Sequence, residues 1–426
     1  MGAFGGQTGG LVRAASDIEL GLYNANDGMY TARLRIGEAE DTGGFGFLFI
    51  GNSLFESQGV TSYVANGTIY LTTKNLQGTD LQCGYAPDLL HIPVRSGNVV
   101  AADGNWGGLN RYDVDGSGLG ANDPYNMVFA FAGTGTNLNS TGSGDSINRK
   151  QTLVTGGTTQ RIGYLVSEGI TRVDAILGPG GTTVRWDIQE GGTTHVTTGS
   201  GTLNNGAGTD TSAYAAGTRL NLSSALDANA QYWVQLAAPT AGNLNCDGII
   251  LSNSNKGIQM LNGCRVGASL WDTYNAATKA AMITTPTSRT GAPCTNMRVC
   301  VMNYITNECN VQRALDDFQT NYQTRITDVL AAGMSCVLEI PCPYDESVHG
   351  LAIPWSAYVQ RIYRLADAND CMVIDHWKAT GSPTTHALYE TTLGWTNTTY
   401  GRHLTDKSAR WQAVQRAAAL YKALRG

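Results

Sequence analysis

The sequence predicts an α/β protein with a mainly parallel sheet and an inserted β-rich domain. From about residue 255 onward, strand-like and helix-like segments alternate, which is typical of parallel strands with helices on both faces. An apolar run at 47–50 stops at Gly51-Asn52-Ser53, as expected for a buried strand that ends in a tight turn. Residues 60–250 are rich in Gly, Thr, Asn and Ser and contain short alternating segments, which favours a β-sandwich or jelly roll.

The C-terminal part carries the clearest element signals. Gly333 is expected to close one helix, Pro354 lies near the start of the next, and Thr405 or Asp406 caps the last. The apolar runs and the amphipathic segments between them predict strands at 257–261, 298–305, 335–341 and 371–375, and helices at 268–282, 310–333, 353–370 and 405–426.

These signals divide the 426 residues into three parts, in line with the two to three domains that the length suggests. Residues 1–45 form a separate, partly β lead-in segment. Residues 46–64 and 251–426 form the α/β domain. Residues 65–250 form the insertion, which follows the first strand and helix, at the edge of a sheet where loops tolerate insertions.

Composition limits the partners and the compartment. Charged residues make up only 15% and the net charge is −6, which argues against nucleic acid or an anionic membrane as a partner. The sequence contains no run of eighteen apolar residues, so we expect no transmembrane helix. The N-terminus lacks the basic start and apolar centre of a secretory signal. Either a signal was removed or the protein leaves the cell by another route, such as lysis.

Cysteine usage points to folding in a cytoplasm. The nine cysteines cannot all pair within one chain, and several lie in apolar strand-like runs where they resemble small buried hydrophobes. We expect them to be mostly reduced and structural, and no Cys/His spacing suggests zinc. The segment 113–118, DVDGSG, resembles a calcium loop, but Pro124 occupies the twelfth position where an EF-hand has glutamate. A looser calcium site is the alternative to a plain turn there.

Ser53 is placed where a nucleophile would be placed, because sites in open α/β sheets lie beyond the carboxyl ends of the strands. A serine hydroxyl needs a base close by, so the rest of the chain must supply one. Four segments, in this order, resemble the four sequence blocks of the SGNH, or GDSL-like, hydrolase family: GNS (51–53), VGAS (266–269), ITNE (305–308) and GRH (401–403). The resemblance covers about half of the chain and implies a three-layer, flavodoxin-like sheet and a serine hydrolase.

The resemblance also implies residue roles. Ser53 matches the nucleophile, and His403, just before the last helix, matches the general base. Gly267 follows a strand and opens a helix, so its N–H is a natural oxyanion donor beside the N–H of Ser53. The side-chain amide of Asn307 would complete the oxyanion hole. Because Ile305 replaces the family's glycine before it, Asn303 is the fallback.

The third member of the triad departs from the family pattern. Tyr400 stands three residues before His403, where the family usually has aspartate. Three alternatives follow: another carboxylate, such as Asp375 at a strand end, substitutes for the aspartate; a backbone carbonyl orients the histidine; or the site is weak. His376, directly after Asp375, is the runner-up for the base. Asp406 is better interpreted as a helix cap than as an acid.

These observations favour a serine esterase that removes O-acyl groups, acetyl above all, from a carbohydrate or polysaccharide. The chemistry needs no metal or cofactor. Trp395, in the loop before His403, is the candidate for lining a substrate pocket. The Gly/Thr/Asn-rich β segments, free cysteines and missing signal resemble a phage tail fibre or tailspike, which would be virion-associated and homotrimeric. A secreted bacterial esterase is the other setting. The alternatives are a carbohydrate-binding adhesin with an inactive SGNH scaffold, and a lipolytic or thioester hydrolase.

Overall fold

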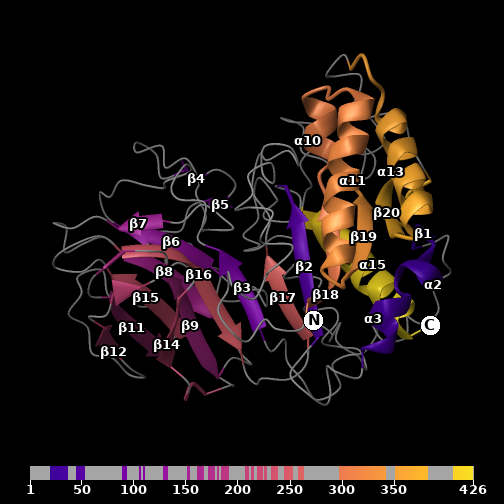
Figure 1. Ribbon diagram of the computed structural model, residues 1–426. Coiled ribbons are helices and arrows are strands. Elements are labelled where there is room, and N and C mark those ends of the chain that lie inside the picture. The colour runs from indigo at the N-terminus through magenta and orange to yellow at the C-terminus, as the bar shows by residue number, and fades with distance from the viewer. Residues whose placement is uncertain are drawn as a thin grey trace.

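The computed structural model describes residues 20–36, 45–52, 297–341, 351–381 and 406–425, together with short segments, mainly strands, between residues 89 and 262 (Figure 1). One eleven-stranded sheet runs through these described residues. Its strands, in spatial order, are β1 (Leu22–Tyr23), β20 (Met372–Asp375), β19 (Ser335–Ile340), β18 (Met297–Asn303), β2 (Phe45–Gly51), β17 (Ile258–Asn262), β3 (Leu89–Pro93), β16 (Leu244–Ser252), β9 (Arg172–Leu177) and β14 (Thr218–Ser223), with β7 (Gln151–Leu153) paired to β16.

The sheet is parallel from β20 to β3 and antiparallel beyond it. Strands β20, β19, β18, β2, β17 and β3 all pair in parallel, whereas β1 and the β3–β16–β9–β14 region pair antiparallel. The order β17–β2–β18–β19–β20 is the flavodoxin-like order 2-1-3-4-5. The parallel α/β sheet predicted from the alternating segments is therefore confirmed.

Strand β2 lies in the middle of this sheet, and all seven of its residues are buried. Its side chains alternate between the two faces, as a pleated strand requires. On one face, the ring of Phe47 lies 5.4 Å from that of Phe45 and 6.4 Å from that of Phe49. On the other face, Leu48 and Ile50 belong to the main apolar cluster. Burial on both faces explains why the run is continuously apolar.

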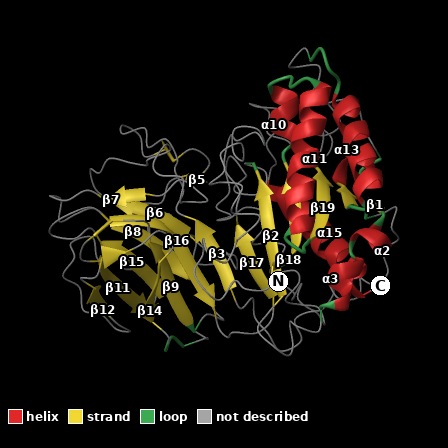
Figure 2. Cartoon of the chain, viewed as in Figure 1, coloured by secondary structure: helices red, strands yellow, loops and turns green. Residues whose placement is uncertain are grey.

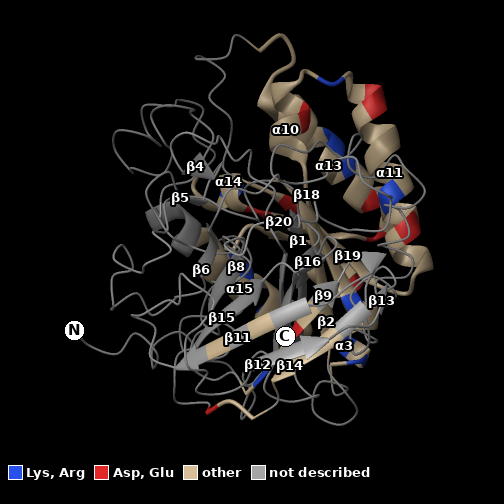
Figure 3. Cartoon of the chain, turned by 90° about the vertical axis from the view of Figure 1, so that its left-hand side faces the viewer, with Lys and Arg blue, Asp and Glu red and all other residues tan. Residues whose placement is uncertain are grey.

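Helices cover both faces of the parallel part (Figure 2). On one face, the apolar cluster joins β18 and β19 to three helices, α10 (Ile305–Asn310), α11 (Leu315–Ala331) and α13 (Trp355–Asn369). Acidic and basic positions alternate with uncharged ones along α11 and α13 (Figure 3), and Arg361 of α13 pairs with Asp316 of α11 at 3.1 Å. The other face carries the short helices α2 (Ala25–Gly28) and α3 (Tyr30–Leu34) and the long C-terminal helix α15 (Asp406–Arg425). Helix α14 (His376–Ala379) directly follows β20.

Helix α11 shows how the sequence pattern becomes packing. Its buried residues, Phe318, Tyr322, Ile326 and Val329, recur at helical spacing and form one stripe against the sheet. Gly333, at φ +78°, follows the end of the helix, as predicted.

The predicted single helix at 310–333 is wrong at its start. The chain forms α10 first, and α11 begins only at Leu315. Gln312 between them adopts a left-handed φ of 52°, which interrupts the helical path. The hydroxyl of Tyr358 donates to the carbonyl oxygen of Arg313 at 2.6 Å and so fixes the turn from the neighbouring helix.

The described part of the lead-in segment packs on the sheet. Strand β1 pairs with β20, and the N–H of Asp375 donates to the carbonyl oxygen of Gly21 at 2.9 Å. Gly21 has φ +63°, and a Cβ added there would lie 2.0 Å from the carbonyl oxygen of Asp375. Only glycine fits this close approach at the edge of the sheet.

The described elements between β3 and β16 are strands, in line with the β-rich composition. Besides β7, β9 and β14, a five-stranded antiparallel sheet consists of β12 (Ala207–Asp210), β11 (Val184–Glu190), β15 (Tyr232–Ala237), β8 (Arg161–Val166) and β6 (Val128–Ala132). Two further pairs are β10 (Gly180–Gly181) with β13 (Ala213–Tyr214) and β4 (Asn105–Trp106) with β5 (Leu109–Asn110). Among the helices that the structure describes, none has the length and apolar character to cross a membrane.

Candidate active site

The end of β2 is tied to the end of β18. Gly51, the last residue of β2, pairs with Asn303, the last residue of β18. The backbone N–H of Asn52 then donates to the carbonyl oxygen of Asn303 at 3.3 Å, and Asn52 is fully buried. The residue directly before Ser53 is thus fixed to the neighbouring strand.

Two of the six predicted site residues, Asn307 and Asp375, belong to the described part of the chain. The other four predicted site residues lie outside the described residues: Ser53, Gly267, His403 and Trp395. Tyr400 also lies outside them. The elements that lead to three of them are described. Ser53 comes two positions after the end of β2, Gly267 five after the end of β17, and His403 three before the start of α15.

Asn307 lies in the first turn of α10 and is half-buried. Its backbone N–H donates to the carbonyl oxygen of Tyr304 at 3.1 Å. The entry to the helix is anchored by the N–H of Tyr304, which donates to the hydroxyl of Tyr322 at 2.9 Å. The buried carboxylate of Glu308 accepts from Arg313 at 3.2 Å. These bonds fix the short helix at both ends and so fix Asn307 just beyond the end of β18.

Asn303, the fallback for Asn307, has a different environment. It is only 1% exposed, and its side-chain Nδ2 lies 3.4 Å from Oε1 of Glu339 inside the protein. The amide of Asn303 is therefore directed inward. Of the two asparagines, Asn307 has the more accessible side chain, which favours it as an oxyanion donor.

Asp375, the predicted acid, ends β20 and caps α14. Its Oδ1 accepts from the backbone N–H of Lys378 at 2.8 Å, and its Oδ2 accepts from the hydroxyl of Tyr363 at 2.9 Å. Burial raises the pKa of Asp375, and these two donors oppose the rise. Strands β18 and β19 lie between β20 and β2, so the two strand ends are about 14 Å apart at the usual strand spacing. A histidine would have to bridge this gap.

A cluster of buried polar side chains lies where the three strands β18, β19 and β20 end. We call Asn303, Glu339, His376 and Arg416 the buried edge cluster; each is at most 1% exposed. The guanidinium of Arg416 donates to both oxygens of Glu339, each at 2.6 Å. Nε2 of His376 lies 3.1 Å from Oε1 of Glu339. Although burial alone would raise it, the pKa of Glu339 is lowered to about 2 by Arg416 and His376.

His376, the runner-up for the base, is enclosed by this cluster. Its ring is fully buried, with Nε2 beside Glu339 and Nδ1 hydrogen-bonded to the side-chain oxygen of Gln415. The ring of Trp411 approaches it edge-on at 5.9 Å. An imidazole in this position cannot reach a substrate, so His376 has a structural role.

The sequence analysis missed Glu339 and Arg416. The available signal was a single carboxylate in the otherwise apolar strand 335–340. A charged side chain is almost never fully buried without a partner, so Glu339 called for a cation elsewhere in the chain. Periodicity alone could not identify that cation, because Arg416 lies 77 positions later.

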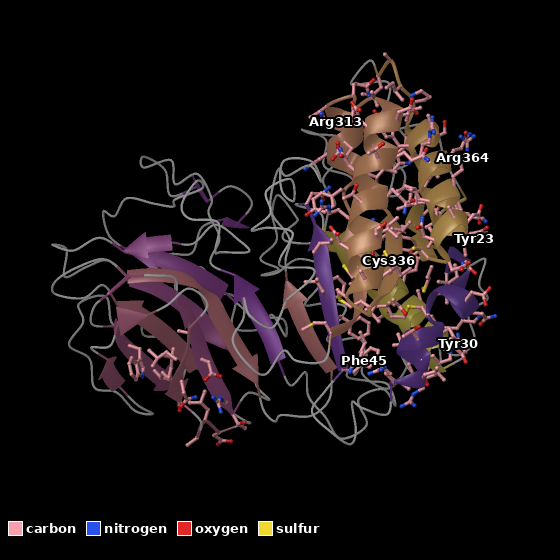
Figure 4. The ribbon with its side chains drawn as sticks, in the orientation of Figure 1. Tyr23, Tyr30, Phe45, Arg313, Cys336 and Arg364 are labelled. Carbon is pink, nitrogen blue, oxygen red and sulfur yellow. The ribbon has the colours of Figure 1, made fainter. Side chains whose placement is uncertain are left out.

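The described residues contain no group of three side chains suited to a metal ion, and the segment 113–118 lies outside them. Among the described residues, four of the nine cysteines are free and buried, as expected for structural thiols: Cys300, Cys309, Cys336 and Cys371. Burial raises the pKa of the Cys300 and Cys336 thiols, which makes them poor nucleophiles. Cys336 lies among the side chains between the sheet and the helices (Figure 4).

No protein-family model matches the sequence, and no curated protein matches it. Solved structures do match. A peptidoglycan O-acetylesterase structure superposes with a TM-score of 0.61 at 14% identity, over 95% of this chain and 99% of the other. A family two carbohydrate esterase from Cellvibrio japonicus matches with a TM-score of 0.30 at 12% identity, over 71% and 96%; a likeness this weak carries no weight. The chain thus shares the fold of that peptidoglycan O-acetylesterase structure, and its strand order is flavodoxin-like.

Proposed function

We propose that this protein is a serine esterase that removes O-acetyl groups from a carbohydrate through an acyl-enzyme. The observation that carries the proposal is the row of adjacent parallel strands β17, β2 and β18. They lead, within five positions of their ends, to Gly267, Ser53 and Asn307. Because parallel strands end at the same edge of a sheet, the row supports one site built from all three residues.

The base comes from a fourth element that reaches the same edge. His403 precedes α15 by three positions, and α15 contacts the ends of β19 and β20 through Arg416 and Trp411. A helix docked there supports a histidine close to the end of β2. Such a histidine can accept the hydroxyl proton of Ser53.

The reaction then proceeds in two steps. Oγ of Ser53 attacks the ester carbonyl carbon while His403 takes its proton. The tetrahedral intermediate collapses, its bond to the sugar oxygen breaks, and that oxygen leaves with the proton from His403. Water attacks the acyl-enzyme with His403 as base, which releases acetate and restores Ser53.

Three donors stabilise the negative oxygen of the intermediate in this proposal. They are the backbone N–H groups of Ser53 and Gly267 and the side-chain amide of Asn307. The accessibility of Asn307 and the inward-facing amide of Asn303 support this assignment.

Asp375 is the proposed acid that orients His403. A carboxylate offers about four acceptor positions, so the bonds from Tyr363 and Lys378 leave room for one from the imidazole. The alternative is a backbone carbonyl that accepts from the histidine, with Asp375 acting only as the cap of α14.

The substrate class follows from two lines of support. One solved structure with a matching fold is a peptidoglycan O-acetylesterase, so O-acetylated peptidoglycan is the first polysaccharide to test. The strands inserted between β2 and β17 would form a β-sandwich that binds the glycan, with Trp395 lining the pocket. We propose that the protein acts outside the cell or on a virion. If it is a tailspike, we expect a homotrimer.

The test compares acetate release by the wild type with that by Ser53→Ala, on 4-nitrophenyl acetate and on O-acetylated peptidoglycan. Ser57→Ala, four positions away in the same segment, is the matched control. We expect Ser53→Ala to lower kcat by at least about a thousandfold, as loss of a catalytic serine does. Ser57→Ala should retain activity.

Equal rates for the wild type and Ser53→Ala would contradict the esterase. Glycan binding without acetate release would then support the adhesin with an inactive scaffold. A preference for long acyl chains over acetyl would support the lipolytic or thioester hydrolase instead.

A further inference from the structure

The buried edge cluster joins elements that are far apart in the sequence. Asn303 comes from the end of β18, Glu339 from β19, His376 from the start of α14 after β20, and Arg416 from α15. Glu339 is the hub, since it contacts the other three at 2.6–3.4 Å. One carboxylate therefore links three adjacent strand ends to the C-terminal helix.

Stability alone is a weak reason for such a cluster. Removing charges from water is costly, and apolar residues of similar size often stabilise a protein as well as a buried ion pair does. Apolar residues, however, cannot fix the orientation of neighbouring polar groups, because they form no directional hydrogen bonds. The two parallel bonds from Arg416 fix the carboxylate plane of Glu339, and that plane in turn meets the amide of Asn303 and the ring of His376.

The cluster connects the two ends of the proposed catalytic machinery. On one side, the carbonyl oxygen of Asn303 accepts from the N–H of Asn52, the neighbour of Ser53. On the other side, Arg416 belongs to the helix that His403 precedes by three positions. Glu339 thus contacts, through Asn303, the strand end that leads to the nucleophile and, through Arg416, the helix that follows the base.

We propose that Glu339, through Asn303 and Arg416, is a positioning residue that sets the distance between the turn carrying the nucleophile and the helix carrying the base. The role in catalysis rests on the esterase proposed above. The positioning itself concerns only how firmly the backbone is held at the end of β2 and at the start of α15. Glu339 touches no substrate, because it is 1% exposed.

The first readout is structural and independent of activity. In Glu339→Gln we expect amide hydrogen exchange to speed up at least tenfold in the peptides that contain Asn52 and the start of α15. Because Glu339→Gln leaves Arg416 buried without its ionic partner, a second variant is needed in case the first does not fold. Glu339→Leu with Arg416→Met removes both charges at once and should show the same local loss of protection.

The control is the same chemical change at a second buried carboxylate. Asp174, fully buried in β9, accepts from Nε and Nη2 of Arg172, at 2.8 and 2.9 Å. Strands β17, β3 and β16 separate β9 from β2. Asp174→Asn should leave exchange at Asn52 and the kcat for 4-nitrophenyl acetate unchanged.

The second readout is whether the Glu339 variants change kcat, KM or both. A looser distance between nucleophile and base lowers kcat but leaves the binding of a small ester intact. We expect both Glu339 variants to lower kcat at least tenfold with KM within about twofold of the wild-type value. A loss of folded protein would also lower the apparent kcat without changing KM, so kcat is calculated per mole of folded protein, measured by circular dichroism.

The outcomes separate the two proposals. Unchanged exchange at Asn52 and α15 in folded Glu339 variants would overturn the positioning role, whatever the activity. An inactive wild type would overturn the esterase, while the exchange data would still decide the positioning. Faster exchange with unchanged kcat would overturn the catalytic part of the inference.

Discussion

The ends of β19 and β20 carry two carboxylates, Glu339 and Asp375, that are each 1% exposed but have different hydrogen-bond donors. Glu339 is surrounded by cationic or ionisable partners, and its pKa is lowered to about 2. Within the described part of the chain, Asp375, one strand away, accepts from a hydroxyl and a backbone N–H, and burial raises its pKa more than these donors and the nearby His376 and Lys378 lower it. Burial by itself therefore does not set the charge state of a carboxylate at this edge; the charge of its donors does.

The difference also separates two kinds of role. Glu339 keeps its charge and organises three other elements. Burial raises the pKa of Asp375, and its carboxylate caps α14. The experiments below test this division, beginning with the side that should give the larger effect.

The largest effect is expected from Arg416→Met. It leaves the Glu339 charge buried with only His376 and Asn303, which should lower the free energy of unfolding by about 3–5 kcal/mol. Urea unfolding measures the change. Glu339→Leu with Arg416→Met is the control and should recover most of the loss. A single variant as stable as the wild type would show that Arg416 is not what stabilises the Glu339 charge.

The next effect is a pH dependence of opposite sign for the two carboxylates. The folded-state pKa of Glu339, about 2, lies below its ordinary value of 4.5, so its stabilisation is complete above pH 4.5 and is lost as the pH falls toward 2. That loss is about 3 kcal/mol. The pKa of Asp375 is raised above 3.8, so its protonated form favours folding and this contribution is lost as the pH rises past the raised value.

Urea unfolding of the wild type between pH 2 and pH 6 measures both slopes. In Glu339→Leu with Arg416→Met, the steep acid slope should disappear, and in Asp375→Asn the opposing contribution should disappear. The same slope in the wild type and the double variant would contradict the low pKa of Glu339.

The smallest effect is expected at Asp375. Asparagine is as good a helix cap as aspartate, so Asp375→Asn should change the free energy of unfolding by less than about 1 kcal/mol. As the proposed acid, however, it should lower kcat for 4-nitrophenyl acetate by at least about a hundredfold with KM retained. Tyr363→Phe, which removes one donor to Asp375, is the control and should leave most of the activity. A kcat within threefold of wild type for Asp375→Asn would assign the acid role to a backbone carbonyl.

Much of the fold followed from local patterns. The continuous apolar run of β2 predicted a strand buried on both faces, and the stripe from Phe318 to Val329 predicted α11. Signals of this kind depend on neighbours within a few positions, so the sequence alone displays them. The split between α10 and α11 was missed because it depends on Gln312, which has a left-handed φ. The side-chain oxygen of Gln312 accepts from the N–H of Ile353 at 2.8 Å, in the segment that leads into α13.

The candidate site was predictable in its elements and only partly in its partners. The four blocks located the strand ends and the final helix, and the order β17–β2–β18 agrees with them. His376 and Asp375 were adjacent candidates in the sequence, yet the fold separates them: one ring lies inside the buried edge cluster and the other side chain caps α14.

The sequence by itself determined the parallel strands β2, β17, β18, β19 and β20 and the long helices α11, α13 and α15, because hydrophobic periodicity and caps act over one or two turns. It also determined that a lone carboxylate in β19 needed a partner. The tertiary structure decided which partner that is, by bringing Arg416 across 77 positions to Glu339. It likewise decided that Glu339 stays charged while the pKa of Asp375 rises, since a pKa depends on the groups within a few ångströms and only the folded chain puts them there.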